Sequence, residues 1–144
     1  MGFIMTSGKR NLLIAVGVMV VIGAIYLNSY SRYSAFVERF DIDKARQRGL
    51  PMLVEYGFQA CPPCKMLKPV LESLDREYSD DFAIGYVDIM ADRNAVSENN
   101  IRATPTLIFY DKDGNELGRI EGYVPKEVIL NKWKELGVDI TGAK

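Results

Sequence analysis

Histidine is absent from the 144 residues of this chain, and cysteine occurs only twice. Without histidine the chain has no His-based metal site, no Ser-His-Asp triad and no Cys-His pair. Two cysteines are too few for a four-cysteine zinc site within one chain. The formal net charge of −1 gives no indication of a polyanionic partner. The chemistry left to this composition is that of two thiols and of carboxylates.

A long apolar run lies near the amino terminus. Residues 12–27 (LLIAVGVMVVIGAIYL) carry no charge. Extended to residue 30, the run has about 19 residues and spans about 28 Å as a helix, close to a hydrocarbon core of about 30 Å. Unlike most helices of a soluble core, it lacks a polar face. We therefore expect a short tail over residues 1–11, a transmembrane signal anchor over 12–30 and a connector over 31–39.

The competing interpretation of this run is a cleaved signal peptide. Such a peptide usually has a shorter apolar core and ends in a small-x-small site. Ser29–Ser31 is the best candidate for such a site and matches poorly, which favours an uncleaved anchor. Lys9 and Arg10 favour a cytoplasmic amino terminus, although Arg32 and Arg39 weaken the positive-inside bias. We expect a single-pass membrane protein whose globular domain lies on the extracytoplasmic side, periplasmic or cell-surface.

The remaining residues, 40–140, have the periodicity of one α/β domain. Crossovers between consecutive strands through a helix require parallel pairing, and a closing hairpin adds an antiparallel strand. The fold class expected is therefore α/β, with a central mixed sheet flanked by helices. The connector is compatible with a short helix or an edge strand. We expect strands over 51–56, 82–89, 106–110 and 116–121, and helices over 41–48, 65–78 (kinked at Pro69), 91–100 and 125–136.

Both cysteines lie in the motif Cys61-Pro-Pro-Cys64, between an expected strand and an expected helix. A helix amino terminus stabilises an anion and lowers the pKa of a thiol, so Cys61 is the predicted nucleophile. Cys64, one turn further on, is expected to be more buried and to act as the resolving thiol. Pro62 and Pro63 suit a helix start, because their missing N–H groups would have no partner there.

Two other interpretations of the cysteine pair are half of a zinc site and a structural disulfide. The first needs ligands from a second chain. The second closes so short a loop that it constrains the unfolded chain little. The position at a strand-to-helix junction favours a redox motif.

Several separated segments resemble the thioredoxin family in the right order. They are MLVEY before the cysteines, CPPCKMLKP around them, IRATPTLIF, the turn KDGNE and Gly122. The resemblance runs from about Phe40 to Leu136. It implies a thioredoxin-like fold and a thiol–disulfide oxidoreductase that acts on protein disulfides. It also implies no metal, and no cofactor beyond the redox-active disulfide Cys61–Cys64.

The resemblance also implies further site residues. Glu55 stands where the family has a buried aspartate, and there it would accept the proton of Cys64 with a pKa raised by burial. The alternative is a carboxylate that only forms a hydrogen bond and supports its strand. Thr104-Pro105 resembles the cis-proline loop, which faces the cysteines and pairs with an extended substrate. Without the resemblance, an ordinary trans peptide is expected there. With Pro62 and Pro63, this loop would bind substrate.

The chain departs from the family at Ala60 and Gly57, where tryptophans are usual, and in having Pro-Pro between the cysteines. The short spacing from Cys64 to Pro105 leaves no room for the helical insert of DsbA-type oxidases, which favours a reductant. An unidentified membrane or extracytoplasmic partner would then exchange electrons with it. The alternatives are a disulfide oxidase, an isomerase, or a non-enzymatic tethered binding module with a structural or metal-binding cysteine pair.

Overall fold

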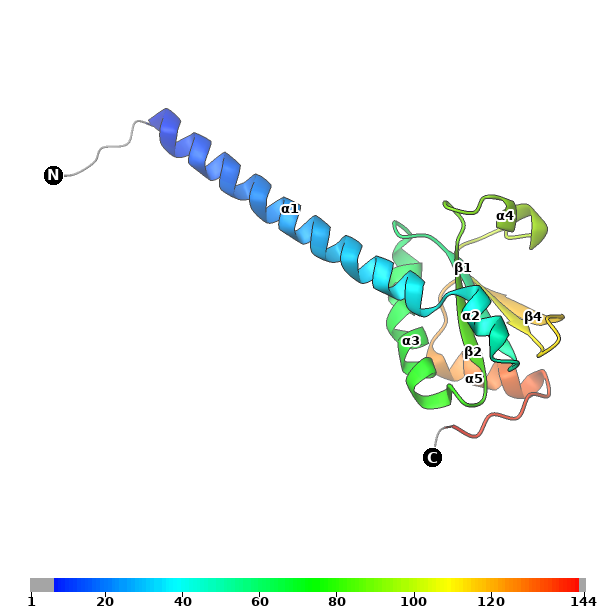
Figure 1. Ribbon diagram of the computed structural model, residues 1–144. Coiled ribbons are helices and arrows are strands. Elements are labelled where there is room, and N and C mark those ends of the chain that lie inside the picture. Colours follow the sequence, from blue (N-terminus) through cyan, green and yellow to red (C-terminus); the bar gives the residue numbers. More distant parts are fainter. Residues whose placement is uncertain (1–6, 143–144) are drawn as a thin grey trace. The chain divides into compact units, whose positions relative to one another are not determined.

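The computed structural model describes residues 7–142, which divide into two compact units between Phe36 and Val37 (Figure 1). The first element is the helix α1, Ser7–Arg39. The connector expected over 31–39 is thus helical and continuous with the apolar run, which resolves the choice between helix and strand. Residues 7–11 of the expected tail are helical as well. Residues 1–6 of that tail lie outside the described residues.

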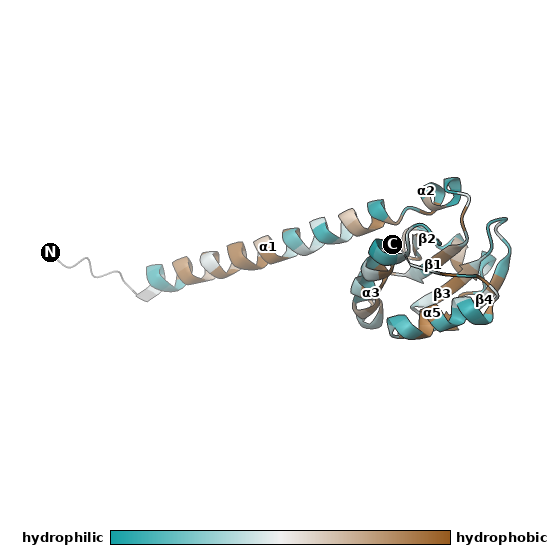
Figure 2. Cartoon of the chain, turned by 90° about the horizontal axis from the view of Figure 1, so that it is seen from below, coloured by the Kyte–Doolittle hydropathy of each residue, from teal (hydrophilic) through white to brown (hydrophobic). Residues whose placement is uncertain are grey.

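Several turns of α1 are hydrophobic (Figure 2). Its apolar side chains are exposed, among them Met19, Val20 and Ile25 at 64–71% exposure. Its most apolar window has a mean hydropathy of 2.3, and none of that window is buried within the protein. The helix is therefore long and apolar enough to cross a membrane. A signal sequence near an amino terminus meets the same criterion of length and composition.

The second unit contains a four-stranded sheet in the order β2-β1-β3-β4. β1 pairs in parallel with β2, whereas β3 is antiparallel to both β1 and β4. The expected mixed sheet is thus confirmed. The elements of this unit are α2 (Ile42–Gln47), β1 (Met52–Gly57), α3 (Pro62–Tyr78), β2 (Ala83–Asp88), α4 (Asn94–Glu98), β3 (Thr106–Tyr110), β4 (Glu116–Glu121) and α5 (Lys126–Glu135).

The parallel pairing expected for the second strand–helix–strand unit is wrong, because β3 runs antiparallel to β1. The physical reason is the length of α4, which has five residues rather than the ten expected. Such a helix advances about 7.5 Å, whereas returning along a six-residue strand requires about 20 Å. The chain therefore enters β3 at the end of the sheet where β2 and β1 finish. This topology brings the start of β3 beside the end of β1.

The two faces of the sheet bury different side chains, because alternate residues of a strand point to opposite faces. One face is packed around Trp133 of α5, whose ring lies 4.8 Å from that of Phe109 and 5.2 Å from that of Phe82. In α3 the buried residues include Leu67, Leu71 and Leu74, a helical spacing. Figure 2 shows α2 and α5 on opposite sides of the sheet.

The opposite face forms a second cluster with α2 and α4, which includes Val54, Tyr56, Ile108, Ala45 and Ala95. Strand alternation therefore assigns Tyr56 to the α2 and α4 face and its neighbour Glu55 to the α3 and α5 face. Helix α3 continues through Pro69, and the expected kink there stays a prediction.

Candidate active site

The cysteine motif opens α3 directly. Cys61 is the N-cap residue with extended backbone (φ −75°, ψ 114°), and Pro62 and Pro63 occupy the first helical positions. The Cys64 N–H donates a hydrogen bond of 3.2 Å to Cys61 Sγ. The predicted position of Cys61 at a helix amino terminus is thus confirmed, although the helix begins three residues earlier than expected. Pro62 and Pro63 have no N–H group, so the Cys64 N–H and the helix dipole are what favour negative charge on that sulfur.

The two cysteines form a disulfide with an S–S distance of 2.13 Å and a Cα–Cα distance of 5.3 Å. Both residues are buried, with 2% of Cys61 and 6% of Cys64 exposed. The expectation that Cys64 is the more buried of the two is therefore wrong. In the oxidised form, the bond and the N-cap hydrogen bond hold Cys61 Sγ against the start of α3 rather than toward solvent.

Glu55 lies in the middle of β1 with 1% of its surface exposed. Neither carboxyl oxygen has a hydrogen-bond partner among the described residues. Burial raises the pKa of Glu55 from 4.5 to about 8, against a smaller lowering by the charge of Lys68. The alternative role of Glu55, a carboxylate that only forms a hydrogen bond and supports its strand, therefore has no donor within residues 7–142. A carboxyl with this pKa changes its protonation near neutral pH.

Gly57, at the end of β1, shows how close Glu55 comes to the cysteines. A Cβ atom built on Gly57 would lie 3.0 Å from Cys64 Sγ and 3.0 Å from Glu55 Oε1. The sulfur and the carboxyl oxygen are therefore separated by no more than twice that distance. At such a separation a single water molecule is enough to connect a thiol and a carboxylate. The structure thus brings Glu55 and Cys64 together, as the resemblance implies.

The peptide bond between Thr104 and Pro105 is cis, as the family resemblance implies. Pro105 is buried and Thr104 is half-buried. The next residue, Thr106, pairs with Tyr56 in the sheet, so this loop enters β3 beside the end of β1. The Gly122 N–H donates a 2.7 Å hydrogen bond to the Pro105 carbonyl oxygen. The sheet therefore places three separate segments at one end, those of Glu55, Cys61 and Pro105.

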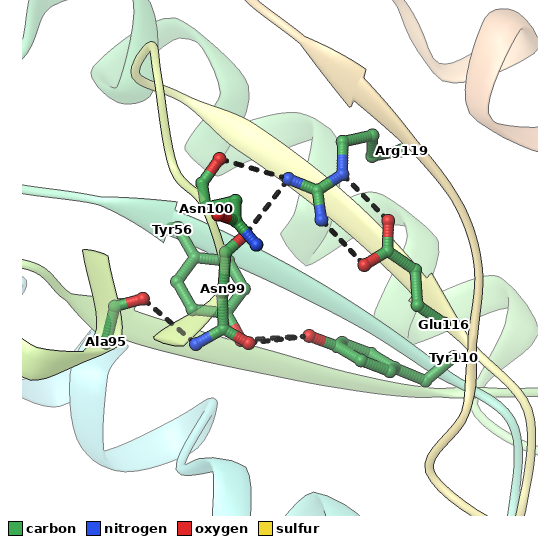
Figure 3. Close-up of polar contacts among 7 residues, drawn as sticks. All are labelled: Tyr56, Ala95, Asn99, Asn100, Tyr110, Glu116 and Arg119. Atoms are coloured by element: carbon green, nitrogen blue, oxygen red, sulfur yellow. Dashed lines mark hydrogen bonds and ion pairs between the residues drawn. The ribbon is translucent and has the colours of Figure 1, made fainter. Parts of the chain in front are cut away.

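A polar network ahead of this loop was not anticipated from the sequence (Figure 3). The Arg119 guanidinium of β4 donates to the carbonyl oxygens of Asn99 and Asn100, at 3.0 and 3.3 Å. It also forms two hydrogen bonds with the Glu116 carboxylate, at 2.6 and 2.7 Å. Asn100 has a positive φ of 51°. Arg119 therefore holds the segment that leads from α4 to the cis peptide.

The same network continues through side chains in the sheet. The Tyr110 hydroxyl donates to Asn99 Oδ1 at 3.2 Å and lies 3.0 Å from the Tyr56 hydroxyl. Asn99 Nδ2 in turn donates to the Ala95 carbonyl oxygen at 2.9 Å. From the sequence alone, Tyr56 and Tyr110 are expected only to lie in strands, and Asn99 only to lie at the end of a helix. No local pattern indicates that they meet.

The α2 and α4 face also carries a hollow of about 380 Å³. Tyr56 reaches it from the face of β1 opposite to Glu55, so the sheet separates this hollow from the cysteine pair. None of the predicted site residues lines it. Its lining residues are Ile42, Asp43, Arg46, Tyr56, Val87, Asp92, Ala95, Glu98 and Asn99.

Residues 36–135 match the family described as Thioredoxin. The chain belongs to the thioredoxin family. It is 32% identical over 85 residues to Thioredoxin 1 of Synechococcus elongatus, covering 59% of this chain and 78% of that protein. It is 36% identical over 80 residues to thioredoxin of Chlamydia pneumoniae, covering 56% of this chain and 76% of that protein.

The fold comparison agrees with the family match. A mutant thioredoxin from Halobacterium salinarum superposes with a TM-score of 0.60 at 22% identity, covering 69% of this chain and 85% of that one. The thioredoxin-like fold expected from the sequence is therefore confirmed.

Family membership and the bonded cysteine pair together make this protein a thiol–disulfide oxidoreductase. Proteins of the thioredoxin family act on protein disulfides. The expectation of an enzyme is confirmed, and the non-enzymatic binding module is set aside.

Proposed function

We propose that this protein is a membrane-tethered reductant of protein disulfides outside the cytoplasm. One observation carries the proposal: the Cys61–Cys64 disulfide caps α3 next to the buried carboxyl of Glu55, in a chain that also contains the apolar helix α1. The cysteine pair supports the reaction, and α1 supports the location. No helical insert separates the cysteines from Pro105, which favours reduction over oxidation.

In its reduced form, the protein would begin with the Cys61 thiolate. Cys61 Sγ attacks one sulfur of a substrate disulfide, forming a mixed disulfide and releasing the other substrate sulfur as a thiolate that takes up a proton. Cys64 then loses its proton and attacks Cys61 Sγ, which breaks the mixed disulfide. The second substrate sulfur leaves and is protonated in turn. Two electrons and two protons pass to the substrate, and the Cys61–Cys64 disulfide remains.

Glu55 would accept the proton of Cys64 in the second half of this reaction. Its carboxyl is unpaired among the described residues, and its pKa of about 8 is close to that of a free thiol, about 8.5. Proton transfer between groups of matched pKa is efficient. The short separation from Cys64 Sγ supports the same role.

The substrate would bind as an extended segment against Thr104 and Pro105, with Pro62 and Pro63 at the opposite edge. Strand addition uses main-chain hydrogen bonds, which give affinity without a requirement for one sequence. Thr104 is half-buried and Pro62 is exposed at the start of α3. These residues fit a surface that accepts many protein disulfides.

The tether implies a partner that returns the protein to its dithiol form. We propose a membrane or extracytoplasmic dithiol protein as that electron donor. It would attack the Cys61–Cys64 disulfide, become oxidised and leave the dithiol behind.

Activity is tested with the full chain in detergent micelles and insulin as substrate, with dithiothreitol as electron donor. We expect the wild type to accelerate insulin reduction and Cys61→Ser to abolish the acceleration. Cys64→Ser should accumulate the mixed disulfide, which is visible on a non-reducing gel. A wild-type rate equal to that of Cys61→Ser contradicts the proposal.

The direction of the reaction is tested by the reduction potential of the cysteine pair, equilibrated against glutathione. A reductant should have a value near that of thioredoxin, about −270 mV, and an oxidase a value near that of DsbA, about −120 mV. An intermediate value near about −180 mV, with refolding of a scrambled protein, would favour an isomerase.

The tether is tested by expression of the full chain in a bacterial host. We expect the protein to stay in the membrane pellet after alkaline carbonate washing, and α1 to remain uncleaved by mass. Protease added to spheroplasts should degrade the thioredoxin domain. Protection from that protease, or release into the wash, contradicts the proposed location.

A further inference from the structure

Gly57 differs from the other described glycines in what surrounds it. Among the glycines from Gly8 to Gly142, its added Cβ makes the closest contacts, 3.0 Å to Cys64 Sγ and 3.0 Å to Glu55 Oε1, with Cys64 Cβ at 3.5 Å. Contacts this short are tighter than almost all real Cβ contacts. Both near atoms are reacting atoms of the proposed mechanism. The space above Gly57 is therefore bordered by both the Cys64 sulfur and the Glu55 carboxyl.

The conformation of Gly57 does not require glycine. Its φ lies outside the left-handed region, and it is an ordinary strand residue paired with Asp88 of β2. Glycine within a strand costs conformational entropy and contributes no side-chain packing. Such a glycine marks close approach by another group. Here the approaching groups are the Cys64 sulfur and the Glu55 carboxyl.

Neither neighbour has an easy way to move. Cys64 is buried in the first turn of α3, and in the oxidised form its Sγ is also bonded to Cys61. Glu55 is buried in β1, so its carboxyl is confined by the packed core. A methyl group at position 57 would therefore press against both the sulfur and the carboxyl oxygen and displace one of them.

We propose that Gly57 is a positioning residue that keeps open the short path for the proton between Cys64 Sγ and the Glu55 carboxylate. The inference rests on the proposed role of Glu55 as proton acceptor. In the resolving step, the S–H bond of Cys64 breaks, its proton passes to Glu55 Oε1, and the sulfur electron pair forms the bond to Cys61 Sγ. The mixed disulfide between Cys61 and the substrate breaks at the same time, and the substrate sulfur leaves as a thiolate. Glu55 later returns the proton to solvent. Gly57 itself exchanges nothing.

The test compares Gly57→Ala with Gly85→Ala in the full chain. Gly85 is also a strand glycine, and its added Cβ would lie 3.2 Å from Val54 Cγ2, so it is a control of similar crowding in the core. The readout is the pH dependence of insulin reduction, together with the ionisation of Glu55 followed by its carboxyl infrared band. We expect Gly57→Ala to lower the rate of insulin reduction about tenfold at neutral pH. The same substitution should shift both the pH profile of the reaction and the pH at which the infrared band of the Glu55 carboxyl changes. Gly85→Ala should move neither.

A second variant separates positioning from simple crowding. Aspartate at position 55 is one methylene shorter, so it withdraws its carboxyl from the added methyl group. The double variant Glu55→Asp/Gly57→Ala should therefore be more active and more stable than additivity predicts. If the effects of Glu55→Asp and Gly57→Ala on activity and stability simply add in this double-mutant cycle, the inference is overturned. If Gly57→Ala alone does not fold, the double variant should still fold, and failure of both would equally overturn it.

The outcome with Glu55→Gln identifies which proposal fails. If Glu55→Gln shifts the pH profile and a folded Gly57→Ala does not, the role of Gly57 is wrong and that of Glu55 stands. If Glu55→Gln leaves the profile unchanged, the role of Glu55 is wrong, and the inference about Gly57 falls with it.

Discussion

The hydroxyl groups of Tyr56 and Tyr110 lie 3.0 Å apart on the α2 and α4 face of the sheet. Tyr110 gives its only hydroxyl proton to Asn99 Oδ1, so Tyr56 must be the donor in the pair. Burial raises the pKa of both tyrosines, and both hydroxyls stay protonated at neutral pH. The order of donation therefore runs from Tyr56 to Tyr110 to Asn99.

This order predicts that Tyr110→Phe is more destabilising than Tyr56→Phe. Removing the Tyr110 hydroxyl leaves both the Tyr56 hydroxyl and Asn99 Oδ1 unpaired, whereas removing that of Tyr56 leaves Tyr110 bonded to Asn99. We expect a loss of about 1–3 kcal/mol for Tyr110→Phe and about half of it for Tyr56→Phe. Urea unfolding measures both, and the exposed Tyr123→Phe serves as the control. Equal losses would contradict the donor order.

Arg119 is predicted to order the segment that leads to the cis peptide. Arg119→Ala removes two hydrogen bonds to the carbonyl oxygens of Asn99 and Asn100. We expect a loss of about 1–2 kcal/mol, because the side chain is partly exposed, and faster amide hydrogen exchange over residues 99–105. Arg119→Lys should recover little, since an ammonium lacks the planar fork that serves both Glu116 and the carbonyls. Unchanged exchange in Arg119→Ala would contradict this role.

The pKa of Glu55 predicts a stability that falls as the pH rises. Folding raises that pKa from 4.5 to about 8, so the folded state holds a proton that the unfolded state releases between those values. The stabilising contribution is fully present below about pH 4.5 and is lost as the pH rises to about 8; it is on the order of 5 kcal/mol at most. Glu55→Gln should remove this dependence of the free energy of unfolding on pH between about pH 4.5 and pH 8. Parallel curves for the two proteins, measured by urea unfolding at a series of pH values, would show that Glu55 does not titrate this way.

Gly49 is predicted to need its positive φ of 63° between α2 and β1. Among residues 7–142, no atom outside the adjoining residues lies within 4 Å of an added Cβ, so any cost of Gly49→Ala comes from the backbone alone. We expect that substitution to cost about 1–2 kcal/mol, and Gly49→Asn to cost less, because asparagine tolerates this conformation better. Thermal unfolding compares the two variants. A larger loss for asparagine than for alanine would contradict the backbone explanation.

Local signals in the sequence were sufficient for much of this protein. The cysteine motif, with Pro62 and Pro63, predicted a helix amino terminus at Cys61, because helix capping depends on neighbouring residues, although the apolar spacing placed the first helical residue at Lys65. Alternating or continuous apolar runs predicted all four strands within about two residues at each end. The uncharged run over residues 12–27 predicted the apolar helix, since length and composition alone decide whether a helix suits a membrane.

Features that depend on distances between separate segments required the folded chain. The short α4 reversed β3, and the disulfide in the helix cap buried Cys61 as fully as Cys64. No local pattern could indicate that Gly57 leaves space between Glu55 and the Cys64 sulfur, because a pleated strand and a helix must first pack together to form that space. Residue order alone was enough to predict a dithiol site at Cys61 and Cys64. The packing of α3 on β1 then placed the Glu55 carboxyl beside the Cys64 sulfur and set the distance between them.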